Sequence, residues 1–131
     1  MPESSILLVD DEKDIRDIAG LLLESAGYKV CCAADGRAAL LALDEQPFDL
    51  VITDMLMPEM DGVELMAAIR RQNPDQRIIA MSGGGRAPKE SYLKIGHLCG
   101  AHELLSKPFN REQLLRVVES CGVKPGGAAV L

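Results

Sequence analysis

The chain has 131 residues, a length that favours one domain with its own core. Hydrophobic residues make up 47% of it, which excludes a disordered chain, and the formal net charge of −6 argues against a broad nucleic-acid-binding surface. No apolar run approaches the roughly 20 residues of a membrane span, and the N-terminus lacks the features of a signal peptide, so we expect a cytoplasmic protein.

The first half of the chain alternates between strand and helix patterns. The apolar run at residues 6–9 is too short for a typical helix and has no polar alternation, which predicts a strand covered on both faces. The next apolar residues follow helical spacing and stop at Gly27; they are Ile15, Ile18, Ala19, Leu22 and Ala26. A charged strand at 28–34 and a helix over 36–44, capped by Asp35, follow.

The second half repeats this alternation. Residues 50–52 and 78–81 are apolar runs that predict buried strands, and residues 102–106 carry a charge and predict a weaker strand. Polar content places this last strand and the one at 28–34 near the edges of the sheet. Helices are predicted from Asp61, between Pro88 and Cys99, and after Asn110.

Repeated strand–helix pairs define the fold class. They predict an α/β protein with (βα)5 architecture, a three-layer doubly wound parallel sheet with right-handed crossovers. The most apolar strands belong at the centre, which the flavodoxin-like order 2-1-3-4-5 provides. We expect one domain, residues 1–121, and a flexible C-terminal tail, residues 122–131, that is rich in Gly, Pro and Ala.

Carboxylates follow two strands that this order makes neighbours. Asp10 and Asp11 follow the first strand, and Asp54 follows the third. Doubly wound sheets bind ligands at the carboxyl ends of their strands where the strand order reverses, which here lies between these two strands. Carboxylates this close repel one another unless a cation compensates. A hard divalent cation such as Mg2+ would compensate, and so would the ammonium of Lys107 after the fifth strand.

Ser82 adds a hydroxyl at the same edge, because it ends the fourth strand. The sequence thus combines candidate metal ligands, a nucleophile, a cation and a hydrogen-bond donor at the carboxyl ends of strands. That set suits phosphoryl transfer, in which catalysis is mostly positioning and charge neutralisation. An aspartate can itself accept the phosphoryl group.

These residues give the chain a resemblance to a known family. Over most of its length it resembles the receiver domain of two-component response regulators. The resemblance is specific because its motifs occur in order, each at the end of a predicted strand. They are Asp10-Asp11, Asp54 followed by Pro58 and Asp61-Gly62, Ser82, and Lys107-Pro108-Phe109.

The resemblance implies a phosphoryl acceptor and its partners. Asp54 would take the group from a histidine kinase or a histidine phosphotransfer protein. Ser82 would hydrogen-bond a phosphoryl oxygen, and Lys107 would pair with Asp54 before phosphorylation and with the phosphoryl group afterwards. In the family the peptide between this lysine and the following proline is usually cis, so we expect a cis bond between Lys107 and Pro108.

The resemblance also implies a metal site for Mg2+. Asp11 and Asp54 would bind the ion directly, and the main-chain carbonyl of Leu56 would be the third protein ligand. Asp10 would act mainly through a metal-bound water. Asp61 has a different expected role, because its spacing to Glu64 is that of a helix capping box.

Two features depart from the family pattern. The family usually has Tyr or Phe three residues before its lysine, and this chain has Leu104. Three glycines, Gly83 to Gly85, follow Ser82 and give the backbone wide freedom. We therefore hypothesise that switching relies on movement of the loop at 83–88 and the helix that follows it.

Several functions remain open at this point. The leading hypothesis is a stand-alone receiver, monomeric or dimerising on phosphorylation, whose output is protein–protein contact through the fourth helix, fifth strand and fifth helix. A phosphate shuttle or sink in a relay, and a degenerate receiver acting only by binding, are the alternatives. A phosphatase is disfavoured, because Leu56 stands where such enzymes usually carry a second aspartate. We therefore expect no enzyme activity beyond the chain's own phosphorylation and dephosphorylation, and no direct contact with nucleic acid or membrane.

Overall fold

The computed structural model describes residues 4–55, 62–82 and 100–125. Its strands are β1 (Ser5–Val9), β2 (Lys29–Ala33), β3 (Leu50–Asp54), β4 (Ile78–Ser82) and β5 (Glu103–Ser106). Its helices are α1 (Lys13–Ser25), α2 (Gly36–Glu45), α3 (Gly62–Gln72) and α5 (Arg111–Ser120). The helix predicted between Pro88 and Cys99 lies outside the described residues, as does Asp61 with its expected cap.

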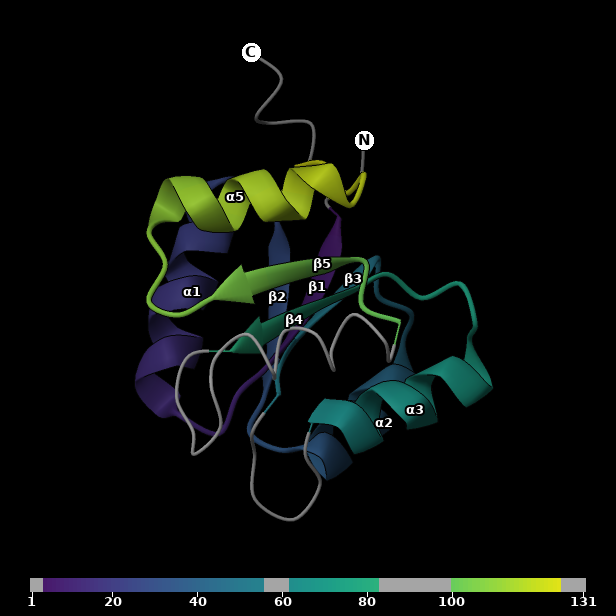
Figure 1. The fold of residues 1–131 in the computed structure, drawn as a ribbon. Helices are drawn as coiled ribbons and strands as arrows, with labels where there is room; N and C mark the ends of the chain where they lie inside the picture. Colours follow the sequence, from purple (N-terminus) through teal and green to yellow (C-terminus); the bar gives the residue numbers. More distant parts are fainter. Residues whose placement is uncertain (1–3, 56–61, 83–99, 126–131) are drawn as a thin grey trace.

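The five strands form one parallel sheet in the order β2-β1-β3-β4-β5. Helices α1 and α5 cover one face and α2 and α3 cover the other, so the three-layer α/β fold predicted from the sequence is confirmed (Figure 1). Every residue of β3 and of β4 is buried, whereas the edge strand β2 exposes Lys29. The uninterrupted apolar runs therefore belong to the centre of the sheet, as expected.

Alternate residues of each central strand fill two separate cores. In β1, Leu8 packs with Leu23 of α1 and Leu114 of α5 on one face. Leu7 packs with Leu65 of α3 on the opposite face. Because both faces are covered by helices, the strand needs no polar side, which explains why its sequence shows no alternation.

Helix α1 buries, at least in part, all but one of the apolar residues whose spacing predicted it. Ala19 and Leu23 are fully buried, and Leu22 and Ala26 are partly buried as expected, but Ile18 is 56% exposed. Successive residues are about 100° apart around a helix, so Ile18 beside Ala19 falls just outside the buried stripe. Ile18 therefore follows the helical spacing without facing the core.

The chain remains packed beyond residue 121, where the sequence placed the start of a flexible tail. Val123 is buried, and its carbonyl accepts a hydrogen bond from the Tyr28 hydroxyl at 3.0 Å. The Ser4 hydroxyl donates to the Lys124 carbonyl at 2.6 Å. Residues 126–131 lie outside the described part. Within the described part, no helix has the length and apolar character that spanning a membrane requires.

Candidate functional site

The carboxyl ends of the central strands bring the predicted polar residues to one edge of the sheet. Asp10 directly follows β1 and Asp54 ends the neighbouring strand β3; they are 0% and 6% exposed. Ser82 ends β4 on the other side of β3 and is also buried. Burial of two carboxylates at adjacent strand ends is unfavourable unless they are paired, so this edge needs a compensating charge.

Lys107 supplies that charge from the end of β5. Its Nζ lies 2.7 Å from Asp10 Oδ2, 3.4 Å from Asp54 Oδ2 and 4.0 Å from Glu12 Oε1. The lysine therefore lies between the two buried carboxylates, with Asp10 rather than Asp54 as its nearer partner. Its main-chain N–H donates to the Ser82 carbonyl at 2.7 Å, and the peptide bond to Pro108 is cis, as expected.

The contact between Lys107 and Asp10 is a buried ion pair. The ammonium lies 2.7 Å from Asp10 Oδ2, close enough for a charge-assisted hydrogen bond, and no other described residue bonds this oxygen. Burial opposes the charge of Lys107, but its hydrogen bond to Asp10 and the negative charges of Asp54, Asp10 and Glu12 outweigh burial and raise the pKa of this lysine. Lys107 thus remains charged in the folded protein.

The turn after β1 carries three consecutive acidic residues. Asp10 Oδ1 accepts the Glu12 N–H at 2.9 Å, which folds the turn back on itself. One carboxylate oxygen from each of Asp10, Asp11 and Glu12 lies within 4.8 Å of the other two. Asp11 and Glu12 are exposed, so the buried site opens to solvent here. We call Asp10, Asp11, Glu12 and Asp54 the acidic site.

The donor set of the acidic site fits a hard divalent cation. Its carboxylates outnumber the one ammonium group, Lys107, that the described residues place against them. Asp10 Oδ2 retains unused acceptor capacity inside the protein. Oxygen ligands that exceed the available positive charge are the usual environment of such ions. Leu56, whose carbonyl was predicted as a further ligand, lies outside the described residues.

Gly62 fixes how the chain leaves the strand that carries Asp54. The Met55 N–H donates to the Met81 carbonyl at 3.0 Å, and the Gly62 N–H donates to the Met55 carbonyl at 3.1 Å. A Cβ on Gly62 would meet the carbonyl oxygen of Asp54 and would lie 2.7 Å from the Cα of Met55. Only glycine allows α3 to begin this close to the end of β3. Met55 itself is buried and packs in the core under α2 and α3.

Two residues of this region, Arg16 and Glu12, have contacts that were not predicted from the sequence. Arg16 of α1 donates from Nη1 to the Asp10 carbonyl at 2.8 Å and so holds the acidic turn against the helix. Glu12 approaches both Lys107 and the two aspartates before it. The sequence pattern that could have predicted the role of Arg16 is a basic residue one helical turn after an acidic run.

Leu104, at the position where the family usually has an aromatic residue, is partly buried and packs in the core under α2 and α3.

The comparison with protein families agrees with this geometry. A family model described as the response regulator receiver domain matches residues 6–119. The chain belongs to this family. Receiver domains of this kind are phosphorylation-switched modules of two-component systems, and phosphorylation on aspartate is characteristic of them. They interact with histidine kinases and with downstream effectors.

Relatives of this receiver include both short and long proteins. It is 34% identical to the response regulator receiver protein CpdR of Brucella abortus, over 87% of this chain and 92% of that protein. It is 35% identical to the transcriptional regulatory protein FixJ of Bradyrhizobium diazoefficiens, over 88% of this chain and 55% of that protein. The match to FixJ therefore covers only part of a longer protein.

Solved structures show the same fold. The chemotaxis protein CheY4 of Vibrio cholerae superposes on this receiver with a TM-score of 0.82 at 35% identity, covering 92% of this chain and 99% of that one. The receiver domain of NtrX from Brucella abortus gives a TM-score of 0.83 at 31% identity, over 88% and 96% of the two chains.

Proposed function

We propose that this receiver accepts a phosphoryl group on Asp54 from a phosphohistidine donor, with Mg2+ at the acidic site, and then changes its protein contacts. The observation that supports this most strongly is the position of Lys107. Its ammonium lies 3.4 Å from Asp54 and 2.7 Å from Asp10, at the carboxyl ends of strands that meet there. The donor would be a histidine kinase or a histidine phosphotransfer protein.

In the proposed step Asp54 is the nucleophile. One of its carboxylate oxygens forms a bond to phosphorus while the bond between phosphorus and the donor's histidine nitrogen breaks, and the electron pair leaves with that nitrogen. Lys107 stabilises the negative charge of the transferred group from its place between the two buried carboxylates. The Ser82 hydroxyl, at the end of the strand beside β3, donates to a phosphoryl oxygen.

Metal binding completes the proposal. Asp10, Asp11 and Asp54 would hold Mg2+, with the main-chain carbonyl of Leu56, and Asp10 would act mainly through water. The ion, when bound, neutralises phosphoryl oxygens that would otherwise be repelled by these carboxylates. Arg16 keeps the acidic turn in place through its hydrogen bond to the Asp10 carbonyl.

The proposed output is protein contact rather than turnover of an external substrate. The receiver would catalyse only its own phosphorylation and dephosphorylation. The phosphoryl group would shift the protein between two conformers by binding one of them better. The contact face would include β5 and α5, which lie side by side in Figure 1. A shuttle or sink in a phosphorelay uses the same chemistry and is the alternative role.

Phosphorylation by small-molecule donors tests this proposal. Wild type and Asp54→Asn would be incubated with Mg2+ and either acetyl phosphate or phosphoramidate, whose P–N bond resembles that of phosphohistidine. We expect an acid-stable, base-labile phosphoryl group on wild type and none on Asp54→Asn. Asp44→Asn, which removes a carboxylate at the end of α2, is the matched control and should label like wild type.

Two outcomes would contradict the proposal. Equal labelling of wild type and Asp54→Asn would remove Asp54 as the acceptor. Absence of labelling with both donors, in protein shown to be folded, would favour a degenerate receiver that acts only by binding.

A further inference from the structure

A pocket lies at the opposite end of the sheet from the acidic site. It has a volume of about 370 Å³ and lies between the C-terminal ends of α2 and α3, next to the starts of β3 and β4. We call it the α2–α3 pocket; its walls include Leu43, Asp44, Phe48, Ile69, Gln72 and Gln76. None of these residues has a part in the proposed phosphoryl transfer.

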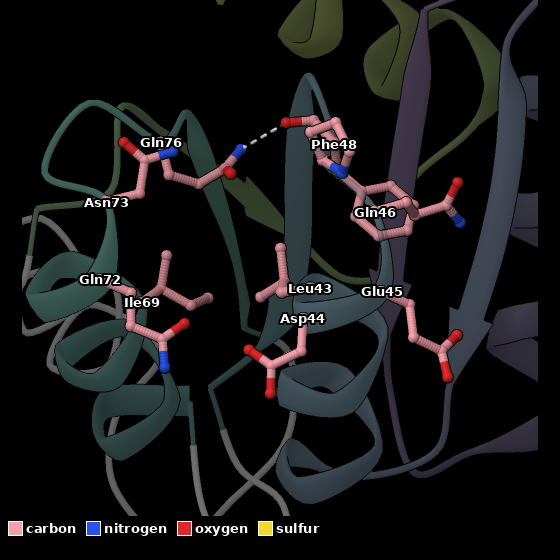
Figure 2. Close-up of a pocket in the computed structure, with 10 residues that line it drawn as sticks. Leu43, Asp44, Glu45, Gln46, Phe48, Ile69, Gln72, Asn73 and Gln76 are labelled. Atoms are coloured by element: carbon pink, nitrogen blue, oxygen red, sulfur yellow. Dashed lines mark hydrogen bonds between the residues drawn. The ribbon is translucent and has the colours of Figure 1, made fainter.

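The α2–α3 pocket has an apolar middle and polar ends. Figure 2 shows Leu43 of α2 and Ile69 of α3 between the two ends. Asp44 and Gln72 lie at one end, on opposite walls, and Gln76 lies at the other. An occupant with an aliphatic stem and a polar head fits such a lining better than a wholly apolar or wholly charged molecule.

The end of the pocket at Asp44 carries negative charge that no ion pair among the described residues neutralises. Helix α2 ends in Asp44 and Glu45, has no basic residue in its last turn, and points the negative end of its dipole here. Both carboxylates are exposed, and neither forms an ion pair with another of the described residues. Acidic residues at a helix C-terminus are unfavourable for the helix itself, which suggests a use outside it.

The last turn of α3 carries two basic residues, Arg70 and Arg71, and neither lines the pocket. Arg70 donates to the main-chain carbonyls of Pro74, Gln76 and Gly100. No lysine, arginine or histidine is among the described residues that line the pocket. A positive charge at this end of α2 can therefore be supplied by another molecule.

Gln76 offers a hydrogen-bond acceptor at the opposite end. It is 5% exposed, and its side-chain nitrogen donates to the Phe48 carbonyl at 3.1 Å and to the Arg77 carbonyl at 3.3 Å (Figure 2). Among the described residues no donor bonds its side-chain oxygen. This oxygen is not among the fully buried atoms, so it is open to the pocket and can accept a hydrogen bond from an N–H group of a ligand.

From these observations we infer that the α2–α3 pocket receives an arginine side chain of a partner protein. The aliphatic stem lies over Leu43 and Ile69, and the guanidinium bonds the carboxylate of Asp44. Arginine suits this end better than lysine, because its planar fork of donors can reach acceptors on two walls at once, here Asp44 and Gln72. An N–H of the same peptide segment bonds the side-chain oxygen of Gln76. The inference goes beyond the proposed function and does not depend on phosphorylation of Asp54.

A peptide titration of the unphosphorylated protein tests the inference. The probes are a capped five-residue peptide with arginine at the centre of four alanines and the same peptide with citrulline, which keeps the shape and lacks the charge. Proton–nitrogen correlation spectra would follow each titration. We expect the arginine peptide to give saturable shifts at residues 43–48 and 69–76, including the side-chain amide of Gln76, and the citrulline peptide to give much weaker ones.

Charge variants distinguish binding at this pocket from nonspecific attraction of the arginine peptide to an acidic protein. Asp44→Asn should weaken binding of the arginine peptide by about twofold to fivefold, the effect of one exposed charge. Glu24→Gln removes an exposed carboxylate from the last turn of α1 and should leave binding unchanged. Three results would each overturn the inference: equal binding of the citrulline peptide, equal weakening by both variants, or shifts at Asp10 to Glu12 instead of at the pocket.

Discussion

At the scale of single residues, the close approach of two main-chain segments explains why position 62 is a glycine. A side chain at position 62 would collide with the main chain of Asp54, the proposed acceptor at the end of β3, and with that of Met55, which follows it. The atoms it would meet belong to the backbone, so they cannot swing away as the end of a side chain can. Gly62 therefore determines how close α3 approaches the acidic site.

We predict that Gly62→Ala lowers the free energy of unfolding by about 1–3 kcal/mol, the usual effect of overpacking. Denaturant unfolding would measure it. Gly20→Ala is the matched control, since Gly20 also lies in a helix but its Cβ would meet only Cys32 Sγ, at 4.0 Å. That control should be neutral or stabilising by about 0.5–1 kcal/mol. Similar destabilisation by both variants would contradict the role given to Gly62.

His102 forms a pH-sensitive contact far from the acidic site. Its Nδ1 accepts the Ile78 N–H at 3.2 Å, so this nitrogen carries no proton in the folded protein. Burial, together with the positive charges of Arg70 and Arg77, lowers the pKa of His102 from its ordinary value of 6.5; Glu103 opposes this. The stabilising contribution of neutral His102 is complete above the unfolded-state value and is lost as pH falls towards the lower pKa of the folded state.

We predict that His102→Gln, which cannot titrate but keeps an acceptor, reduces the loss of stability on acidification below pH 6.5. Thermal melting at a series of pH values on both sides of 6.5 would measure this. Above that value the two proteins should run parallel. An identical acid-side slope for the variant and the wild type would show that His102 does not contribute.

At the scale of elements, a capping box fixes the start of α5. The Asn110 side chain accepts the Gln113 N–H at 2.8 Å, and the Gln113 side chain accepts the Asn110 N–H at 2.9 Å. These bonds satisfy main-chain donors that the first turn of a helix otherwise leaves unpaired. The start of α5 directly follows the segment that carries Lys107, so the cap also defines where that segment ends.

We predict that Asn110→Ala lowers the free energy of unfolding by about 1 kcal/mol. Asn110→Asp keeps a side-chain acceptor at the cap and should retain most of the stability. Equilibrium unfolding of the three proteins would decide the matter. If Asn110→Asp lost as much stability as Asn110→Ala, the hydrogen bond to Gln113 could not be the cause.

Most elements of the fold were predictable from the sequence, because the helix caps and turn residues agree with the spacing of the apolar residues. Asp35 caps α2 as expected, with its side chain accepting the Ala38 N–H at 2.8 Å. The face of α1 was less predictable, since Ile18 and Ala19 are both apolar and only the packed sheet decides which one is buried. Val123 and Tyr28 share one core cluster and a hydrogen bond, a contact between distant parts of the chain that no local pattern signals.

The candidate site was predictable for a different reason. Parallel strands end at the same edge, so strand order places Asp10 beside Asp54, and the long side chain of Lys107 reaches them from β5, past β4. The exact pairing was not predictable: side-chain geometry places Lys107 nearer to Asp10 than to Asp54. Leu56 and the loop at 83–88 lie outside the described residues, so their expected roles stay predictions.

At the scale of the whole molecule, the acidic site concentrates negative charge on a chain whose net charge is already −6. Repulsion among these carboxylates destabilises the folded state, and a bound cation would remove it. Stability should therefore depend on Mg2+. This dependence can be measured without any phosphoryl donor.

We predict that Mg2+ raises the melting temperature of wild type, by an amount that corresponds to about 2.7 kcal/mol at about 100 times Kd. Asp11→Asn should be at least as stable as wild type without Mg2+, because a repulsive charge is gone, and should gain much less on Mg2+ addition. Glu45→Gln, at the far end of the sheet, should respond as wild type does. An equal response of Asp11→Asn would contradict the proposed metal site.

The central claim is that Asp54 carries the phosphoryl group, and chemical trapping tests it most directly. Borohydride reduces an aspartyl phosphate to homoserine, which peptide mass spectrometry can locate in protein treated with acetyl phosphate and Mg2+. We predict homoserine at position 54 alone, and none when the donor or Mg2+ is omitted. Homoserine at Asp10 or Asp11 instead, or labelled protein with an unmodified Asp54, would contradict the claim.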